Sequence, residues 1–276
     1  MKLSIITINY NNLEGLKRTY ESVVCQTWTD YEWIVIDGGS TDGSREFIEE
    51  HQDKFAYWCS EPDKGVYNAM NKGIAMARGE YFNFMNSGDC FYEAQTLENV
   101  FREPLTGDLI YGDWIRIYSD HEEFKEAPKD GFHAIVFFEN VCHQAMFIKS
   151  EILKSKGYDE NLKIYADWKR WMDMSLDGQT FQKVPFTICM FEAEKGLSAT
   201  EFIIRNEEIL QLYDYLPREI GLKMREYHEL RMKEWEYQHN PLISEIIRIT
   251  VHGPSYKTKL IHLGMVIINM IEKVFG

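Results

Sequence analysis

The sequence has little cysteine, and its few cysteines are scattered. Among its 276 residues there are five, and none belongs to a CxxC pair; they are Cys25, Cys59, Cys90, Cys142 and Cys189. Such a set excludes a disulfide framework or a zinc ribbon, and we expect reduced thiols that pack as small apolar side chains.

Positive charge is scarce. The chain has 30 Lys and Arg residues against 44 Asp and Glu residues, a formal net charge of −14. A protein that binds nucleic acid through its phosphates needs a basic face, so we expect no nucleic-acid partner.

Long apolar runs are also missing. No stretch approaches the roughly 20 apolar residues that span a bilayer, and the opening MKLSIITINYNN lacks the form of a signal peptide. We therefore expect a cytoplasmic protein. Hydrophobic residues still make up 45% of the chain, which is enough for a sizeable core and argues against disorder.

The residues that are present alternate between strand-like and helix-like segments. Strands are expected at 3–9, 31–37, 55–61 and 80–86, and helices at 13–26, 44–52 and 65–77. This alternation predicts an α/β fold with a mainly parallel central sheet. Past residue 200 the sequence is charged and helical without strand signals, so we expect a domain over 1–200 and a C-terminal helical extension over 201–276.

A polar cluster follows each expected strand. The clusters are NYNN (9–12), DGGSTDG (37–43), SEPDKG (60–65) and NSGD (86–89). In a parallel sheet these strand ends lie at one edge, where open α/β sheets bind ligands, so we expect a site for a polar, anionic ligand. A plainer interpretation also holds for 37–43, since these are ordinary turn residues and Ser40 or Thr41 could cap the next helix.

Two common phosphate-binding loops are absent. Gly38, Gly39 and Gly43 do not have the GxGxxG spacing, and Gly43 is followed by Ser44 where a Walker A loop needs lysine. These absences weigh against a nicotinamide-dependent or an ATP-hydrolysing enzyme.

Four segments together resemble family 2 glycosyltransferases with the GT-A fold, especially bacterial enzymes of cell-surface polysaccharide assembly. They are SIITINYNN, VIDGGSTDGS, SEPDKGVYNAMNKGIAMARGEYFNFMNSGD and HQAMFIKSEIL…GYDENLKIYADWKRWM, in order across roughly residues 1–200. The resemblance implies a nucleotide-sugar donor, most naturally a UDP-sugar, and a saccharide or lipid-linked acceptor. It also implies Mg²⁺ or Mn²⁺ and inversion at the anomeric carbon.

The resemblance implies a donor site made by residues at and near these strand ends. Asp37 matches the residue that binds the base, usually uracil, and Tyr10 matches a ring near the base. Because Asp37 follows a strand, its replacement is expected to weaken UDP binding with little loss of fold. The other residues of the predicted donor site are Thr7, Asp63, Lys64 and Ser87, of which Lys64 would carry positive charge to the diphosphate. Tyr10 as a core residue and Lys64 as a solvated one are the alternatives.

The resemblance also assigns the chemistry. Asp89 closes the DxD-type motif, which here reads Asn86-Ser87-Gly88-Asp89, and would be the main carboxylate on the metal. Asp167 matches the base that takes the proton of the acceptor hydroxyl. The alternatives are a turn or cap role for Asp89 and an N-cap role for Asp167.

Three further residues are placed near the acceptor or the donor sugar. They are His143, Gln144 and Trp168. His143 could equally be a hydrogen-bonded core histidine, and Trp168 could pack within its helix, as Trp171 is expected to do. One departure from relatives is EKGLSAT, whose single Gly196 leaves the position of that loop open.

Two other functions are considered beside sugar transfer. A sugar nucleotidyltransferase is disfavoured, because NYNNLEG stands where such an enzyme has a glycine-rich basic loop after the first strand. A non-catalytic binding protein stays an alternative, because Asn86 and Gly88 replace carboxylates of the DxD-type motif.

Residues 241–276 are apolar, with four basic and two acidic residues. This tail is expected to lie on the inner face of the cytoplasmic membrane, to pack on the catalytic domain, or to form a dimer seam.

Overall fold

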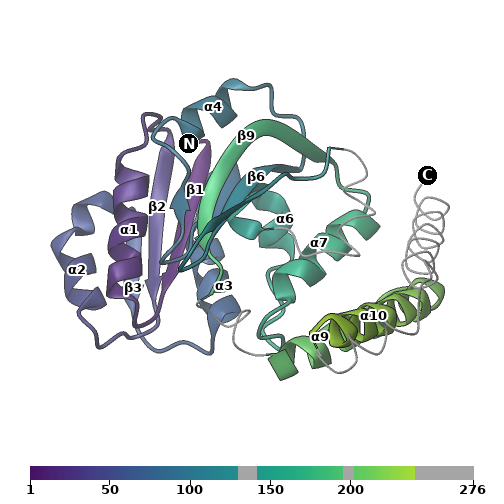
Figure 1. Ribbon diagram of the computed structural model, residues 1–276. Coiled ribbons are helices and arrows are strands. Elements are labelled where there is room, and N and C mark those ends of the chain that lie inside the picture. Colours follow the sequence, from purple (N-terminus) through teal and green to yellow (C-terminus); the bar gives the residue numbers. More distant parts are fainter. Residues whose placement is uncertain (130–141, 195–201, 240–276) are drawn as a thin grey trace. The chain divides into compact units, whose positions relative to one another are not determined.

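The computed structural model describes residues 1–129, 142–194 and 202–239 (Figure 1). These residues fall into two compact units, the first reaching Arg205 and the second beginning at Asn206. The first unit contains the sheet and the second contains most of the C-terminal helices, and each is described by itself.

The first part of the chain builds a parallel half-sheet, as the sequence predicts. Its elements are β1 (Leu3–Asn9), α1 (Leu13–Val24), β2 (Tyr31–Asp37), α2 (Ser44–Glu50), η1 (Gln52–Lys54), β3 (Tyr57–Ser60), α3 (Val66–Met76) and β4 (Tyr81–Phe84). The strands lie in the order β3-β2-β1-β4 and every neighbouring pair is parallel. All residues of β1 are buried, which explains why this strand is apolar on both faces.

The next part extends the sheet with strands that the sequence analysis did not identify. Its elements are β5 (Cys90–Phe91), α4 (Thr96–Arg102), β6 (Leu109–Ile117), β7 (Glu122–Lys125), η2 (His143–Ala145), β8 (Met146–Lys149), α6 (Ser150–Ser155), α7 (Ala166–Leu176) and β9 (Phe181–Glu192). The order continues as β4-β8-β6-β9-β5, with β8 antiparallel to β4 and β6 and with β7 paired to β6. β9 runs parallel to β6 with two register shifts, and it is visibly long and curved (Figure 1).

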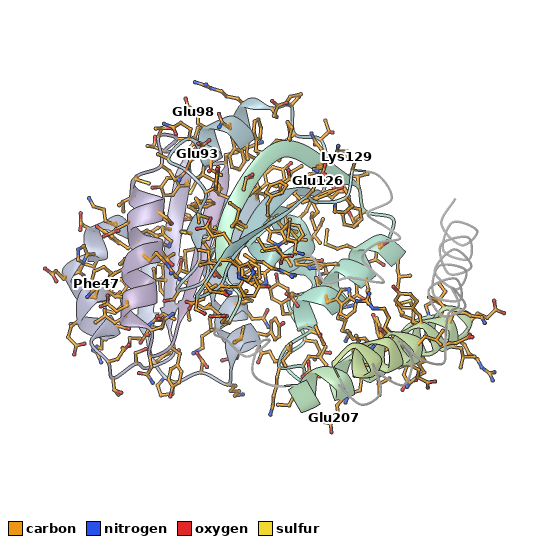
Figure 2. All side chains as sticks on the ribbon, viewed as in Figure 1. Phe47, Glu93, Glu98, Glu126, Lys129 and Glu207 are labelled. Atoms are coloured by element: carbon orange, nitrogen blue, oxygen red, sulfur yellow. The ribbon has the colours of Figure 1, made fainter. Side chains whose placement is uncertain are left out.

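Close packing fixes the helices that border the polar strand ends. A Cβ atom on Gly73 of α3 would lie 2.4 Å from Ile6, so α3 can approach β1 this closely only with glycine there. Phe47 of α2, labelled in Figure 2, contacts the ring of Tyr20 on α1 with centroids 5.4 Å apart. These contacts hold the segments that follow β1, β2 and β3 against the sheet.

Two helices make up the described residues that follow 201. α9 (Phe202–Tyr215) and α10 (Arg218–His239) are joined by a hydrogen bond from Arg225 Nη2 to the Leu210 carbonyl, 2.9 Å long. Within the described ranges, no helix combines the length and apolar character needed to cross a membrane. The loop at Gly196 and the tail 241–276 lie outside the described residues.

Candidate active site

Hydrogen bonds join the polar strand ends at one edge of the parallel half-sheet. Asn9 at the end of β1 donates to Asp37 at the end of β2 over 2.7 Å, and Ser60 at the end of β3 donates to the same carboxylate over 2.6 Å. Asn12 donates to the carbonyl of Ser87, after β4, over 3.0 Å. The predicted convergence of the four polar clusters is confirmed.

Asp37 is the centre of this edge and is fully buried, with 0% of its surface exposed. Its Oδ1 accepts from Asn9 Nδ2 and from Ser40 Oγ, at 2.7 and 2.5 Å. Its Oδ2 accepts from Ser60 Oγ at 2.6 Å, from Ser40 N at 2.9 Å and from Gly39 N at 3.2 Å. Burial alone would raise the pKa of Asp37, but the donated hydrogen bonds outweigh burial and lower it.

This geometry makes Asp37 an ionised structural centre that ties three strand ends together. A carboxylate has about four lone-pair sites, and all are engaged by donors of the described chain. The hydroxyl of Ser40 is used here and on the backbone N–H of Asn11, so it does not cap α2. The expectation that Asp37 can be replaced with little loss of fold is therefore wrong, because the residue lies beneath the turn and not on its surface.

Asp37→Ala is expected to lower the free energy of unfolding by on the order of 3 kcal/mol, because it leaves several buried donors without an acceptor. Since the pKa of Asp37 is lowered, its contribution is present above the unfolded pKa of 3.8 and is lost as the pH falls through the folded value. Urea denaturation at pH 7 measures the loss. Asp42→Ala is the control, since Asp42 is exposed on the same turn and accepts from the backbone N–H groups of Leu13 and Ser44. Equal losses for the two variants would contradict the central role of Asp37.

The other predicted donor-site residues divide into surface and core. Tyr10 is 67% exposed just beyond β1, and Lys64 is exposed between β3 and α3. Asp63 is half-buried and accepts from the backbone N–H of Gly65 at 2.8 Å. Ser87 is half-buried and its hydroxyl donates to the carbonyl of Asn12.

The side chain of Thr7 is engaged inside the protein, which favours a structural role for its hydroxyl over the predicted contact with the donor. Its hydroxyl donates to the carbonyl of Met85 at 2.8 Å and accepts from Trp33 Nε1 at 2.9 Å, and the residue is fully buried. Thr7 lies two residues before the end of β1, where both faces of the strand are covered.

Asp89, the last residue of the NSGD turn, is buried among polar groups. It is 7% exposed, its Oδ2 accepts from Gln144 Nε2 at 2.6 Å, and its Oδ1 accepts a long 3.3 Å bond from the Glu192 backbone. Burial raises the pKa of Asp89 to about 6, although the Gln144 bond partly opposes the shift. Gln144 therefore touches the predicted metal ligand, which its placement near a sugar did not anticipate.

The side chains around Asp89 suit a hard cation. The Asn86 Oδ1 is buried and has no hydrogen-bond partner among the described residues. It adds an amide oxygen to the carboxylate of Asp89, and oxygen ligands are the type that Mg²⁺ and Mn²⁺ prefer. No group of three or more His, Cys, Asp or Glu side chains that could hold a metal occurs in the part of the chain that the structure describes. A cation here would need further oxygens from a bound diphosphate or from water.

Asp167 lies in the first turn of α7, which begins at Ala166, so it is not the N-cap residue. It is 4% exposed and accepts from His143 Nδ1 at 3.0 Å and from the Trp168 backbone at 2.7 Å. The Tyr67 hydroxyl shares its one proton between Asp167, at 3.1 Å, and the Ile164 carbonyl, at 2.5 Å. Tyr67 comes from α3, and burial raises its pKa well above the usual value, so it stays a donor. Three segments thus fix one carboxylate.

His143 links the predicted base to the NSGD turn. Its Nδ1 faces Asp167 at 3.0 Å and its Nε2 lies 2.9 Å from Asn86 Nδ2. If the ring donates through Nδ1 to the carboxylate, Nε2 accepts from the amide, which is a consistent neutral tautomer. The chain Asp167–His143–Asn86 therefore joins the residues predicted for acceptor activation to those predicted for the donor diphosphate.

The two tryptophans of α7 pack inside the protein. Trp168 is 3% exposed and its ring makes an edge contact with Tyr165, with centroids 5.2 Å apart. Trp171 is fully buried. An acceptor platform needs an exposed ring face, so the burial of Trp168 favours the packing alternative.

Sequence reasoning missed one member of this network, Tyr67, and misjudged another, Gln144. Tyr67 lies 100 residues before Asp167, and no spacing in the sequence connects them. The only available signal was its place just after the SEPDKG cluster, at the start of a helix whose inner face had to be buried.

Comparison with known proteins identifies the family of the chain. The family model described as "Glycosyl transferase family 2" matches residues 4–176. An uncharacterized glycosyltransferase of Mycobacterium tuberculosis is 37% identical over 171 residues, which are 60% of this chain and 65% of that protein. A PGL/p-HBAD biosynthesis glycosyltransferase of Mycobacterium bovis is 31% identical over 60% of this chain and 66% of its own length. The matched segments thus span just under two thirds of these relatives.

Solved structures share the fold at low sequence identity. S. aureus TarS 1-349 in complex with UDP-GlcNAc superposes with a TM-score of 0.65 at 14% identity, covering 99% of this chain and 84% of that chain. The mannosyltransferase PcManGT from Pyrobaculum calidifontis, in complex with GDP-Man and Mn²⁺, superposes with a TM-score of 0.62 at 16% identity, covering 98% of this chain and 86% of that chain. These likenesses confirm the predicted GT-A fold. Since the family model matches more than half of its length, the chain belongs to glycosyl transferase family 2.

Proposed function

We propose that this protein transfers a sugar with inversion from a UDP-sugar to a saccharide or lipid-linked acceptor, in the synthesis of cell-surface polysaccharide. The observation that carries the proposal is the hydrogen-bonded chain from Asp167 through His143 to Asn86. It places one oriented carboxylate next to the turn that presents Asp89, as a single displacement at an anomeric carbon requires.

Asp167 is the general base in this mechanism. It takes the proton of the acceptor hydroxyl while the hydroxyl oxygen forms a bond to the anomeric carbon. The bond from that carbon to the diphosphate breaks and its electron pair leaves with the diphosphate, which inverts the configuration. His143 and Tyr67 hold the carboxylate in place, so little reorganisation is needed when the proton moves.

The leaving diphosphate needs positive charge and no protonation. Lys64 is exposed at the same edge of the sheet and would approach the phosphates. Asp89 and Asn86 would hold Mg²⁺ or Mn²⁺, whose charge would offset the negative charge of the departing diphosphate. The fold shared with TarS and PcManGT, crystallised with UDP-GlcNAc and with GDP-Man and Mn²⁺, supports such a donor and cation.

A panel of nucleotide sugars tests this function. The full chain is incubated with each donor, with and without Mn²⁺, and release of free nucleoside diphosphate is measured with saccharide and lipid-linked acceptors. Metal-dependent release of UDP is expected. A sugar nucleotidyltransferase would instead release pyrophosphate from UTP and a sugar phosphate, and a binding protein would shift its melting temperature with a donor but release nothing.

We also propose catalytic residues within 1–200 and a membrane contact made by 241–276, which would bring a lipid-linked acceptor to the site. The tail has a net charge of only +2, so attachment should depend on apolar burial and resist salt. The full chain is expected to float with anionic liposomes, and a chain truncated after residue 240 is not. Failure of the full chain to float, together with unfolding of the truncated one, would show that the tail is structural.

A further inference from the structure

A candidate for base recognition other than Asp37 follows from the way Asp37 is held. Both oxygens of Asp37 are occupied by five donated hydrogen bonds, and the residue has no exposed surface. A base N–H could reach this carboxylate only by breaking the bonds that hold β1, β2 and β3 together. A second carboxylate at the same edge is better placed.

Gly38 marks the position of that carboxylate. An ideal Cβ atom on Gly38 would lie 2.7 Å from Asp63 Oδ2, closer than nonbonded atoms approach, and 3.1 Å from Cδ2 of Tyr10, which is a tight contact. Gly38 is not among the residues with positive φ, so its backbone conformation does not require glycine. The missing side chain instead leaves room for Asp63 and Tyr10, which both lie next to Gly38 just after the end of β2.

Asp63 has an oriented carboxylate with a free acceptor. Its Oδ1 accepts from the backbone N–H of Gly65 at 2.8 Å, which fixes the group. Its Oδ2, the atom above Gly38, receives no hydrogen bond from the described residues. The residue is half-buried, and the ring of Tyr10 beside it is 67% exposed. The pair thus offers an open aromatic surface and a charged acceptor at its rim.

We propose that Asp63 and Tyr10 form the nucleobase site and that Asp63 Oδ2 selects uracil by accepting its N3–H, an inference that rests on the proposed function. Aromatic side chains stack on bases of any type, so Tyr10 supplies affinity without much choice. The choice comes from the carboxylate. Uracil presents a donor at N3, whereas cytosine presents a lone pair there and would repel the Asp63 oxygen.

Two variants test the assignment by isothermal titration calorimetry with UDP, CDP and GDP in the presence of Mn²⁺. The full-length protein is expected to bind UDP in preference to CDP. Asp63→Asn is expected to bind UDP about tenfold or more weakly, because a charge-assisted hydrogen bond is lost. It is expected to bind CDP more tightly, because the amide can donate to N3 of cytosine. Gly38→Ala is expected to lower the preference for UDP without loss of fold, since its Cβ displaces the flexible end of Asp63.

Glu61→Gln is the matched control. Glu61 lies two residues from Asp63 on the same turn and pairs with Lys72, so the substitution removes an equal charge while the proposed base site stays intact. The UDP to CDP preference should not change, and melting temperatures verify that each variant is folded. An unchanged preference in Asp63→Asn would overturn the inference and leave the proposed transfer standing. Tighter binding of GDP than of UDP by the full chain would overturn the inference together with the choice of a UDP-sugar as donor. If the full chain binds no nucleoside diphosphate, the proposed function itself fails.

Discussion

Asp167→Asn is expected to lose transfer activity while it keeps the nucleotide-sugar donor. The amide has the shape of the carboxylate and can still accept from Tyr67 and from the Trp168 backbone, so the start of α7 should be preserved. It cannot take a proton at neutral pH. General-base catalysis contributes about 10²- to 10⁴-fold, so kcat should fall by that factor. Donor affinity, measured by calorimetry, should change little.

Asp177→Asn provides the comparison for that variant. Asp177 is exposed just beyond the end of α7, so the change removes the same charge from the same helix without touching the site. Its kcat should equal that of the unmodified protein. If Asp167→Asn retained half of the original kcat, another group would have to be the base, and His143, whose ring contacts Asp167, would be the first to examine.

The parallel half of the sheet was readable from the sequence because each strand there is short, apolar and bounded by a polar turn. The ends of β1 and β2 match the predicted segments 3–9 and 31–37. The half of the sheet that contains β5, β6, β8 and β9 could not be predicted from the sequence. β5 has two residues, and β9 contains Pro185, which in a sequence argues against a strand. The strands that pair with β9 are also distant from it in sequence, so no local pattern predicts the pairing.

The candidate site was predictable at the level of strand ends, but not at the level of individual hydrogen bonds. Asp37 and Asp63 both follow strands in similar polar turns, and only the fold shows that one is saturated by Ser40 and Ser60 while the other keeps a free oxygen. Likewise, nothing local indicates that Gln144 contacts Asp89. Residue type and position identify the candidates, whereas the partners that decide their roles come from segments far away in the sequence.

Asp89→Asn is expected to abolish metal-dependent turnover and to stabilise the metal-free fold. The pKa of Asp89 rises from 3.8 to about 6 on burial, so between these values the folded protein holds a proton that the unfolded chain has lost. The metal-free fold therefore loses stability as the pH rises through this window, by about 3 kcal/mol at pH 7. The neutral amide removes this cost and can still accept from Gln144, but it takes away the negative charge that would balance the cation.

Urea denaturation in EDTA at pH 4 and pH 7.5 measures the stability effect, and UDP release with Mn²⁺ measures turnover. The gain in unfolding free energy should be up to about 3 kcal/mol at pH 7.5 and close to zero at pH 4. Asp108→Asn is the matched control, because hydrogen bonds from Thr180 and Lys149 outweigh burial and lower the pKa of Asp108. The same substitution should there destabilise the protein at pH 7.5.

Function requires a charge at Asp89 that the metal-free fold disfavours. Cation and donor diphosphate should therefore bind cooperatively, because each reduces the free-energy cost of binding the other. Turnover of the unmodified protein that survives exhaustive chelation would refute the metal role of Asp89.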